Sequence, residues 1–172
     1  MKQSLQETLR ERCLVCDGAM GTQLMLAGLA SGDCGEPWTL KHPDRVLAIH
    51  QRYAAAGADC LITNTFGANC IALARHGAAK DVGTINAAGV RIAREAFGGR
   101  AGFVLGDIGS LGAALEPYGD LSHADAQGAF GEQAFALVEA GVDAIIIGSC
   151  CGSTPDHIQA IRQAVEAFNQ KS

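Results

Sequence analysis

The stretch LVEAGVDAIII (residues 137–147) joins the end of a predicted helix to a short apolar strand. The same design occurs earlier as YAAAGADCLIT (residues 53–63), again with a helix that ends in Ala-Gly and a strand that begins at Asp. Glycine suits the left-handed backbone conformation that closes a helix, so Gly57 and Gly141 are predicted to mark equivalent helix-to-strand corners. This internal repeat favours a barrel built of βα units.

Four apolar runs alternate with helical patterns along the chain. The predicted strands lie within residues 13–21, 59–67, 102–109 and 143–152. The predicted helices cover residues 43–56, 68–96 in two pieces broken near Gly77, 122–140 and 155–169. Short continuous apolar strands suit a parallel sheet that is buried on both faces. The alternation predicts an α/β fold with about four βα units.

The length of the chain limits the architecture. A complete eight-fold barrel takes about 250 residues, whereas this chain has 172. We therefore expect a single domain over residues 1–172, built as an open doubly wound sheet or, as we favour, as a partial (β/α) TIM-barrel-like fold. A partial barrel leaves sheet edges open, and a second copy could cover them, so we expect a homodimer.

The composition indicates which partners to expect. The formal net charge is -5 and no segment clusters Lys and Arg, which argues against nucleic acid as a main partner. No run approaches the roughly 18 consecutive apolar residues of a membrane span, and the N-terminal segment is too polar for a secretory signal, so we expect a cytoplasmic protein. Seven cysteines without an export signal indicate free thiols or metal ligands rather than a disulfide framework.

Two adjacent cysteines follow the last predicted strand. Cys150 and Cys151 stand between Gly148 and Gly152, which permit the backbone turn that lets neighbouring side chains face one metal ion. The positive end of the following helix would lower the thiol pKa values and favour the thiolates that bind zinc. Cys150 and Cys151 are therefore candidate metal ligands. The stretch also fits two small buried residues, a vicinal disulfide, or a phosphate site made by backbone N–H groups.

The other cysteines and His157 carry weaker signals. Cys13 and Cys16 have Cys-x-x-Cys spacing, but they bracket a predicted strand rather than precede a helix, as a redox motif would. His157, in the first turn of the last predicted helix, is either a further ligand or a solvent-facing side chain. Packing is the expected role of the three single cysteines, Cys34, Cys60 and Cys70.

Polar residues stand at the ends of the first three predicted strands: Asp17 and Gly18, then Thr63, Asn64 and Thr65, then Asp107. In parallel α/β folds, ligands bind at the carboxyl ends of the strands, where these residues would meet the cysteine pair. We therefore predict that they line one small-molecule pocket. Each residue taken singly could instead cap a helix or satisfy a loop N–H group.

Five motifs resemble, in order, segments of the homocysteine S-methyltransferase family: LVCDGAMGTQL, GADCLITNTFGAN, GDIGSLGAALEPYGDLS, EQAFALVEAGVDAIII and SCCGSTPDHIQAI. The likeness covers almost the whole chain after residue 12. It is closest to the homocysteine-binding barrel of the cobalamin-dependent members, and betaine-dependent members are more distant.

The resemblance implies methyl transfer to homocysteine at a zinc ion. In the family, three cysteines hold zinc, and zinc takes up the homocysteine sulfur as a thiolate that accepts a methyl group from a donor. By position, Cys150 and Cys151 match two of these cysteines. Asp17 and Gly18 match the segment that holds the amino-acid end of homocysteine. The donor would be a small molecule or a donor-bearing protein.

The chain departs from the family pattern after residue 147. The family has a strand that ends in Glu-Thr there, and the Glu helps to bind the substrate amine. This chain has Gly148 and Ser149 instead and passes directly into the double-cysteine motif. The middle of the barrel, with that Glu and the first zinc cysteine, is absent. A third ligand would come from Cys16, Cys60 or Cys70, from His157, or from a second subunit. The alternative function is a non-catalytic half-barrel that binds a metal or a phosphate-type ligand.

Overall fold

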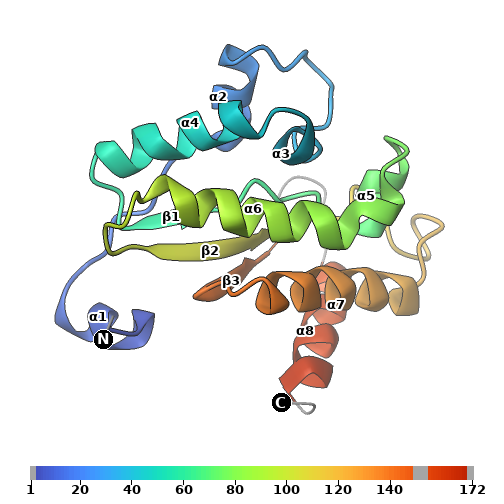
Figure 1. Ribbon diagram of the computed structural model, residues 1–172. Coiled ribbons are helices and arrows are strands. Elements are labelled where there is room, and N and C mark those ends of the chain that lie inside the picture. Colours follow the sequence, from blue (N-terminus) through green and yellow to red (C-terminus); the bar gives the residue numbers. More distant parts are fainter. Residues whose placement is uncertain (1–2, 149–154, 170–172) are drawn as a thin grey trace.

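The computed structural model describes residues 3–148 and 155–169 (Figure 1). Its centre is a parallel sheet with the spatial order β1 (Cys60–Ile62), β2 (Phe103–Ile108) and β3 (Ala144–Ile147). Leu61 lies opposite Val104, and Gly106 lies opposite Ile145. Each strand follows a helix along the chain, so the connections are the crossovers that a parallel sheet requires.

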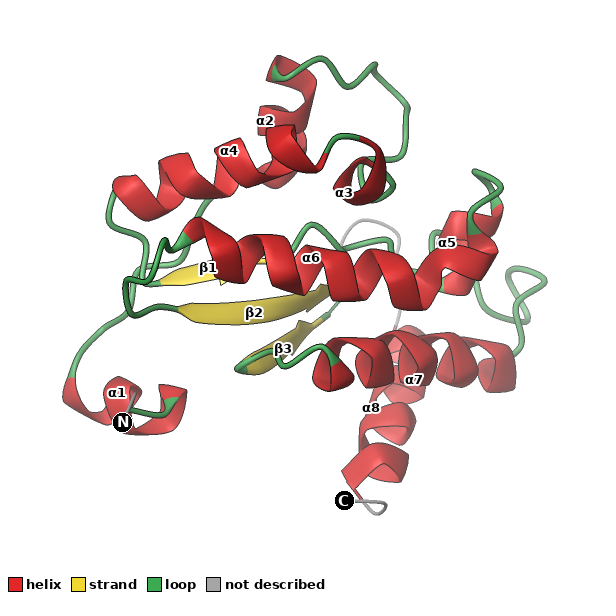
Figure 2. Cartoon of the chain, viewed as in Figure 1, coloured by secondary structure: helices red, strands yellow, loops and turns green. Residues whose placement is uncertain are grey.

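The described helices are those expected from the sequence together with three short ones near the N-terminus (Figure 2). In chain order they are α1 (Leu5–Glu11), α2 (Met20–Leu26), α3 (Trp38–Lys41), α4 (Pro43–Ala55), α5 (Cys70–Ala74), the 3₁₀ helix η1 (Ala79–Asp81), α6 (Val82–Ala96), α7 (His123–Glu139) and α8 (Pro155–Asn169). Ser4 and Glu7 form a capping box at the start of α1.

The structure confirms most of the predicted alternation. Three of the four predicted strands are present, each shorter than expected, and the helices predicted at 43–56, 122–140 and 155–169 correspond to α4, α7 and α8. Gly77, with φ +70°, lies between α5 and η1, where the break was predicted. The same left-handed conformation occurs at both predicted corners, Gly57 (φ +102°) and Gly141 (φ +85°).

The strand predicted within residues 13–21 is wrong, because this segment forms only an isolated bridge between Cys16 and Cys60 before α2 begins. The side chain of Asp17 explains the early end. Its carboxylate oxygens accept hydrogen bonds from the backbone N–H of Ile62, both at 3.1 Å. That N–H would otherwise bond a backbone carbonyl of a continuing strand, so the side chain ends the ladder.

The sheet has two different faces. Leu61, Val104 and Ile108 point to one face, where they join a buried core with α4, α6, α7 and α8. Phe130 of α7 is among the largest fully buried side chains in this core. On the other face, Cys60 and Phe103 belong to a smaller cluster, which Leu5 of α1 and Leu14 partly cover. The long helices α4, α6 and α7 therefore share one face of the sheet (Figure 2).

The strand β3 lies at an edge of the sheet. Its Ile146 is 43% exposed on the face opposite the main core. Such an edge is open to pairing, and the homodimer stays a prediction. No helix in residues 3–148 or 155–169 is long and apolar enough to cross a membrane, and the cytoplasmic location also stays a prediction.

Candidate functional site

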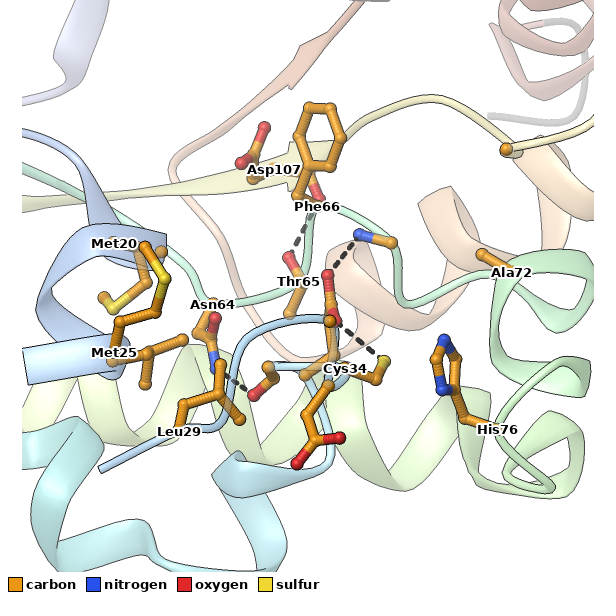
Figure 3. A pocket seen from close by; sticks show the side chains of 18 of the residues that line it. Met20, Met25, Leu29, Cys34, Asn64, Thr65, Phe66, Ala72, His76 and Asp107 are labelled. Atoms are coloured by element: carbon orange, nitrogen blue, oxygen red, sulfur yellow. Dashed lines mark hydrogen bonds between the residues drawn. The ribbon is translucent and has the colours of Figure 1, made fainter. Parts of the chain in front are cut away.

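A cavity of about 510 Å³ opens where β1 and β2 end (Figure 3). Four of the residues predicted to bind a ligand line it: Thr63, Asn64, Thr65 and Asp107. Figure 3 shows Met20, Met25 and Leu29 on one side of the cavity and Cys34 and His76 on the other. The carboxyl ends of the strands therefore form a site with a polar floor and an apolar wall.

A closed ring of hydrogen bonds joins the ends of β1 and β2. The backbone N–H of Asp107 donates to Thr63 Oγ1 at 3.0 Å, and Thr65 Oγ1 donates to the backbone carbonyl of Asp107 at 2.8 Å. The two hydroxyl oxygens lie 2.6 Å apart. Since Thr65 gives its proton to the carbonyl, Thr63 must donate to Thr65. The two threonines thus use their protons to hold the cavity floor together.

Two buried amides support this floor from behind. Gln133 of α7 donates through Nε2 to the backbone carbonyl of Thr65 at 2.6 Å. Asn86 of α6 donates to the carbonyl of Ala68 at 2.8 Å. Both amides are fully buried, so they fix the loop after β1 against two helices. Neither amide was predicted from the sequence, although a polar residue on an otherwise apolar helix face was the available signal.

The loop before α3 forms a second wall of the cavity. Asn64 donates through Nδ2 to the backbone carbonyl of Gly35 at 2.9 Å and so holds this loop above β1. Glu36 accepts a hydrogen bond from the N–H of Gly67 through Oε1 at 2.8 Å. A Cβ at Gly67 would lie only 2.9 Å from that oxygen, so a larger residue here would displace the Glu36 carboxylate. Glu36 is a site residue that the sequence analysis did not identify.

Asp107 has the carboxylate that is available to a ligand. It lines the cavity and is partly buried. Burial, with a smaller contribution from the negative charge of Glu36, raises the pKa of Asp107 to about 6. Within the described part of the chain, the carboxylate has no hydrogen-bond partner. At neutral pH, Asp107 is therefore an ionised and unpaired acceptor in the cavity wall.

Asp17 and Gly18 lie beside the cavity rather than in its lining. The Asp17 side chain is 1% exposed and is occupied by the N–H of Ile62. Burial, with the like charge of Asp107 acting in the same direction, raises the pKa of Asp17 to about 6. Gly18 is exposed, and a Cβ there would lie 3.2 Å from Tyr53 Oη. The side chain of Asp17 therefore supports the end of β1. A ligand contact at Asp17 or Gly18 would be made by backbone atoms.

Comparison with known proteins assigns the family. A family model described as "Homocysteine S-methyltransferase" matches residues 14–147. The chain belongs to the homocysteine S-methyltransferase family. The match ends at residue 147, where the sequence also departs from the pattern of this family.

Two methionine synthases are similar in sequence. The one from Mycobacterium tuberculosis (strain ATCC 25618 / H37Rv) is 36% identical over 157 residues, and the one from Mycobacterium leprae (strain TN) is 35% identical over 157 residues. In both cases the match covers 85% of this chain and 13% of the relative. The chain therefore corresponds to a small part of these proteins.

A solved structure shares the fold. The homocysteine methyltransferase MmuM from Escherichia coli, in its metallated form, superimposes with a TM-score of 0.77 at 22% sequence identity. The superposition covers 96% of this chain and 63% of that chain. The chain thus shares its fold with 63% of the MmuM chain.

The described residues do not form the zinc site that would be expected of a homocysteine S-methyltransferase. Cys150 and Cys151 lie outside the described residues. Within residues 3–148 and 155–169, no group of three or more His, Cys, Asp or Glu side chains is placed to hold a metal ion. Burial raises the pKa of both Cys34 and Cys60 to about 12, which disfavours the thiolates that zinc needs. A zinc site would therefore need at least one ligand from outside the described residues.

Asn in place of Asp17 is expected to stabilise the protein at neutral pH. The pKa of Asp17 is about 6 in the folded state, whereas a carboxyl group of Asp ordinarily has a pKa of 3.8, so the buried anion costs roughly 2–3 kcal/mol above pH 6. Asn accepts the same bond from Ile62 without a charge. As pH falls through 6 the native carboxylate takes up its proton, and the advantage of Asn declines until it vanishes near pH 4.

Urea unfolding at pH 7.5 and pH 4.5 measures this difference, and Asp120→Asn is the control because Asp120 is an exposed acid outside the cavity. The stabilisation should be larger at pH 7.5 than at pH 4.5. An equal or opposite effect at the two values would show that the Asp17 carboxylate is not held at a cost.

Proposed function

We propose that the chain binds homocysteine in the cavity and presents its sulfur for methylation, as a single shortened barrel domain over residues 1–172. Membership of the homocysteine S-methyltransferase family supports the reaction class. The observation that carries the proposal is the Asp107 carboxylate, which has no partner among the described residues and lies in a cavity at the ends of parallel strands. This is the position where α/β folds bind small ligands.

Asp107 is suited to bind the ammonium group of homocysteine. The family residue expected for this purpose, a Glu after the strand that ends near residue 147, is replaced by Gly148. A second carboxylate, that of Glu36, lines the same cavity. An ammonium group would pair with Asp107 by a charge-assisted hydrogen bond. It would also relieve the repulsion that the two carboxylates exert on each other.

The apolar wall suits the rest of the substrate. Met20, Leu24 and Met25 line the cavity from α2, and their thioether and alkyl groups offer dispersion contacts to the two methylene groups of homocysteine. The N–H groups near Gly18 are suited to the substrate carboxylate. Thr63 and Thr65 act by holding the floor, because their protons are already used within the protein.

Cys150 and Cys151 are the proposed zinc ligands. Zinc would supply a Lewis acid that keeps the homocysteine sulfur deprotonated near neutral pH. A zinc site with an open position usually has three protein ligands, so a third is needed besides this pair. The methyl donor is proposed to be a small molecule or a donor-bearing protein.

The partial barrel is proposed from the layering of the fold. Parallel strands carry their long helices on one face, as the strands of a (β/α)₈ barrel do. A doubly wound sheet would have such helices on both faces. The superposition on 63% of MmuM supports a barrel with part of its wall missing. A homodimer would cover the open edge at β3.

Asparagine in place of Asp107 is expected to weaken L-homocysteine binding about 10- to 100-fold, because a charge-assisted hydrogen bond in a cavity is replaced by a neutral one. Isothermal titration calorimetry at pH 7.5 measures the change, and Asp120→Asn is the control. The analogue 4-mercaptobutanoate, which lacks the amino group, should bind wild type and Asp107→Asn equally. Equal loss for both ligands would contradict an ammonium contact at Asp107.

Methyl transfer tests the activity itself. Wild-type protein loaded with zinc is incubated with L-homocysteine and S-methylmethionine, betaine or methylcobalamin, and methionine is measured. Methionine formation that falls in Asp107→Asn supports the enzyme. Homocysteine binding without methionine from any donor would support the non-catalytic half-barrel instead.

A further inference from the structure

His50 is a fully buried imidazole without a hydrogen-bond partner. It lies on α4 between Val46, Ile49 and Ala54, which are also buried. The side chain is 0% exposed, and neither Nδ1 nor Nε2 makes a hydrogen bond in the described part of the structure. Most buried polar atoms have a partner, so an exception requires an explanation.

The nearest charged group to His50 is the carboxylate of Asp17. Nδ1 of His50 lies 3.8 Å from Oδ2 of Asp17, and the two side chains are 0% and 1% exposed. This distance is longer than a hydrogen bond, which for a nitrogen donor is about 2.7–3.2 Å. A shift of the ring by about 1 Å would form the bond, and no solvent competes for either atom.

The protonation states determine which atom donates. Burial lowers the pKa of His50 to about 4 and raises the pKa of Asp17 to about 6. At pH 7 the imidazole is therefore neutral and the carboxylate is ionised. An ionised carboxylate can only accept, so the single imidazole proton belongs on Nδ1, facing Asp17. A hydrogen bond between the two side chains would select this tautomer, as it does for other buried histidines.

We propose that His50 is a positioning residue, which donates from Nδ1 to Asp17 and so holds that carboxylate ionised against the end of β1. Asp17 in turn holds the N–H of Ile62, the residue before the cavity floor at Thr63. His50 thus acts on the ligand site through two other residues. The effect on ligand binding rests on the proposed homocysteine site, whereas the tautomer does not.

The groups around the pair define its pH response. Asp107 of β2 adds a like charge that favours protonation of Asp17. Cys60 of β1 lies near enough for Asp17 to disfavour its thiolate. On α4, the Tyr53 hydroxyl donates to the carbonyl of Ala19 at 3.1 Å. The other groups that face Asp17 are thus an acid and a thiol, so an N–H from His50 stabilises the anion.

Nitrogen-15 NMR of the histidine side chains tests the tautomer directly, without any ligand. The signals of His50 are assigned by their absence in His50→Gln, because the chain has five histidines. We expect a neutral imidazole with the proton on Nδ1 at every pH from 5.5 to 8. A proton on Nε2, or protonation of His50 near pH 6.5, would overturn the proposal.

The pH profile of L-homocysteine binding tests the positioning role. In wild type the affinity should fall as pH drops through about 6, the pKa of Asp17 and Asp107. His50→Phe, which fills the site without an N–H donor, should move the midpoint upward by at least about 0.5 pH unit. At pH 7 it should bind several-fold more weakly. His50→Gln keeps a donor and should resemble wild type.

Thermal melting establishes that each variant is folded. A folded His50→Phe variant with the wild-type pH profile would overturn the positioning role. If His50→Phe does not fold, two other results decide. The imidazole proton should be on Nδ1, and His50→Gln should show the pH profile of wild type. If wild type does not bind L-homocysteine, the proposed function fails, while the NMR measurement still decides whether His50 donates to Asp17.

Discussion

Serine in place of Cys150 or Cys151 is expected to remove tightly bound zinc from the protein. A serine hydroxyl keeps its proton near neutral pH, whereas zinc binds the thiolate form of cysteine. The described residues provide no alternative cluster of ligands, so the loss should exceed the roughly 10- to 100-fold effect of changing a group that only orients a ligand. Each substitution alone should therefore abolish stoichiometric zinc.

Zinc content after dialysis against a weak chelator measures this loss, for protein produced in medium that contains zinc. Cys13→Ser is a matched control, because Cys13 is an exposed free cysteine of the first segment. It should retain the zinc of the wild type. One equivalent of zinc in both Cys150→Ser and Cys151→Ser would place the metal elsewhere and would leave the cysteine pair with a packing role.

Alanine in place of Phe130 is expected to lower the free energy of unfolding by about 3–5 kcal/mol. Phe130 of α7 is 0% exposed and belongs to the core between the sheet and its helices. Removal of the ring loses its burial and leaves a cavity among closely packed atoms, which rigid helices on both sides cannot close. This is a large part of the total stability of a small domain.

Phe135 on the same helix is the matched control, because its side chain is 58% exposed. Phe135→Ala should change the free energy of unfolding by less than about 1 kcal/mol. Urea unfolding of both variants measures the difference. Similar values for Phe130→Ala and Phe135→Ala would contradict the placement of α7 against the sheet.

The two buried carboxylates of the site lower the stability of the folded protein at neutral pH. Asp17 and Asp107 are both carboxylates whose pKa values burial raises to about 6, so each is ionised at neutral pH at the expense of the folded state. Residues that destabilise a fold are commonly retained where function needs them. The expected stabilisation by Asp17→Asn and the loss of homocysteine by Asp107→Asn are two sides of this arrangement.

Local rules in the sequence were sufficient for most of the fold. The order of strands and helices follows from apolar periodicity, and the corners at Gly57 and Gly141 follow from the backbone freedom of glycine. The same rules failed for the first strand. There, the carboxylate of Asp17 accepts a hydrogen bond from the backbone N–H of Ile62, which is 45 positions away in the sequence. No local pattern contains such a contact.

The position of the site could be predicted from the sequence, but the roles of its residues could be predicted only in part. Parallel strands place their carboxyl ends together, and Thr63, Asn64, Thr65 and Asp107 do meet at one cavity. Their roles differ, because the two threonine hydroxyls donate to protein acceptors, whereas the Asp107 carboxylate has no partner among the described residues. Glu36 was not identified, because it reaches the cavity from a loop whose path depends on packing.

By itself, the sequence determined the family, the alternation of strand and helix, and the edge of the sheet at which polar residues gather, because these follow from short-range periodicity and from motifs in order. Tertiary structure alone decided which polar groups are left free for a ligand. The burial of Asp17 and His50 and the exposure of Asp107 to the cavity arise from contacts between distant segments. Hydrogen bonding and desolvation depend on those contacts rather than on residue type.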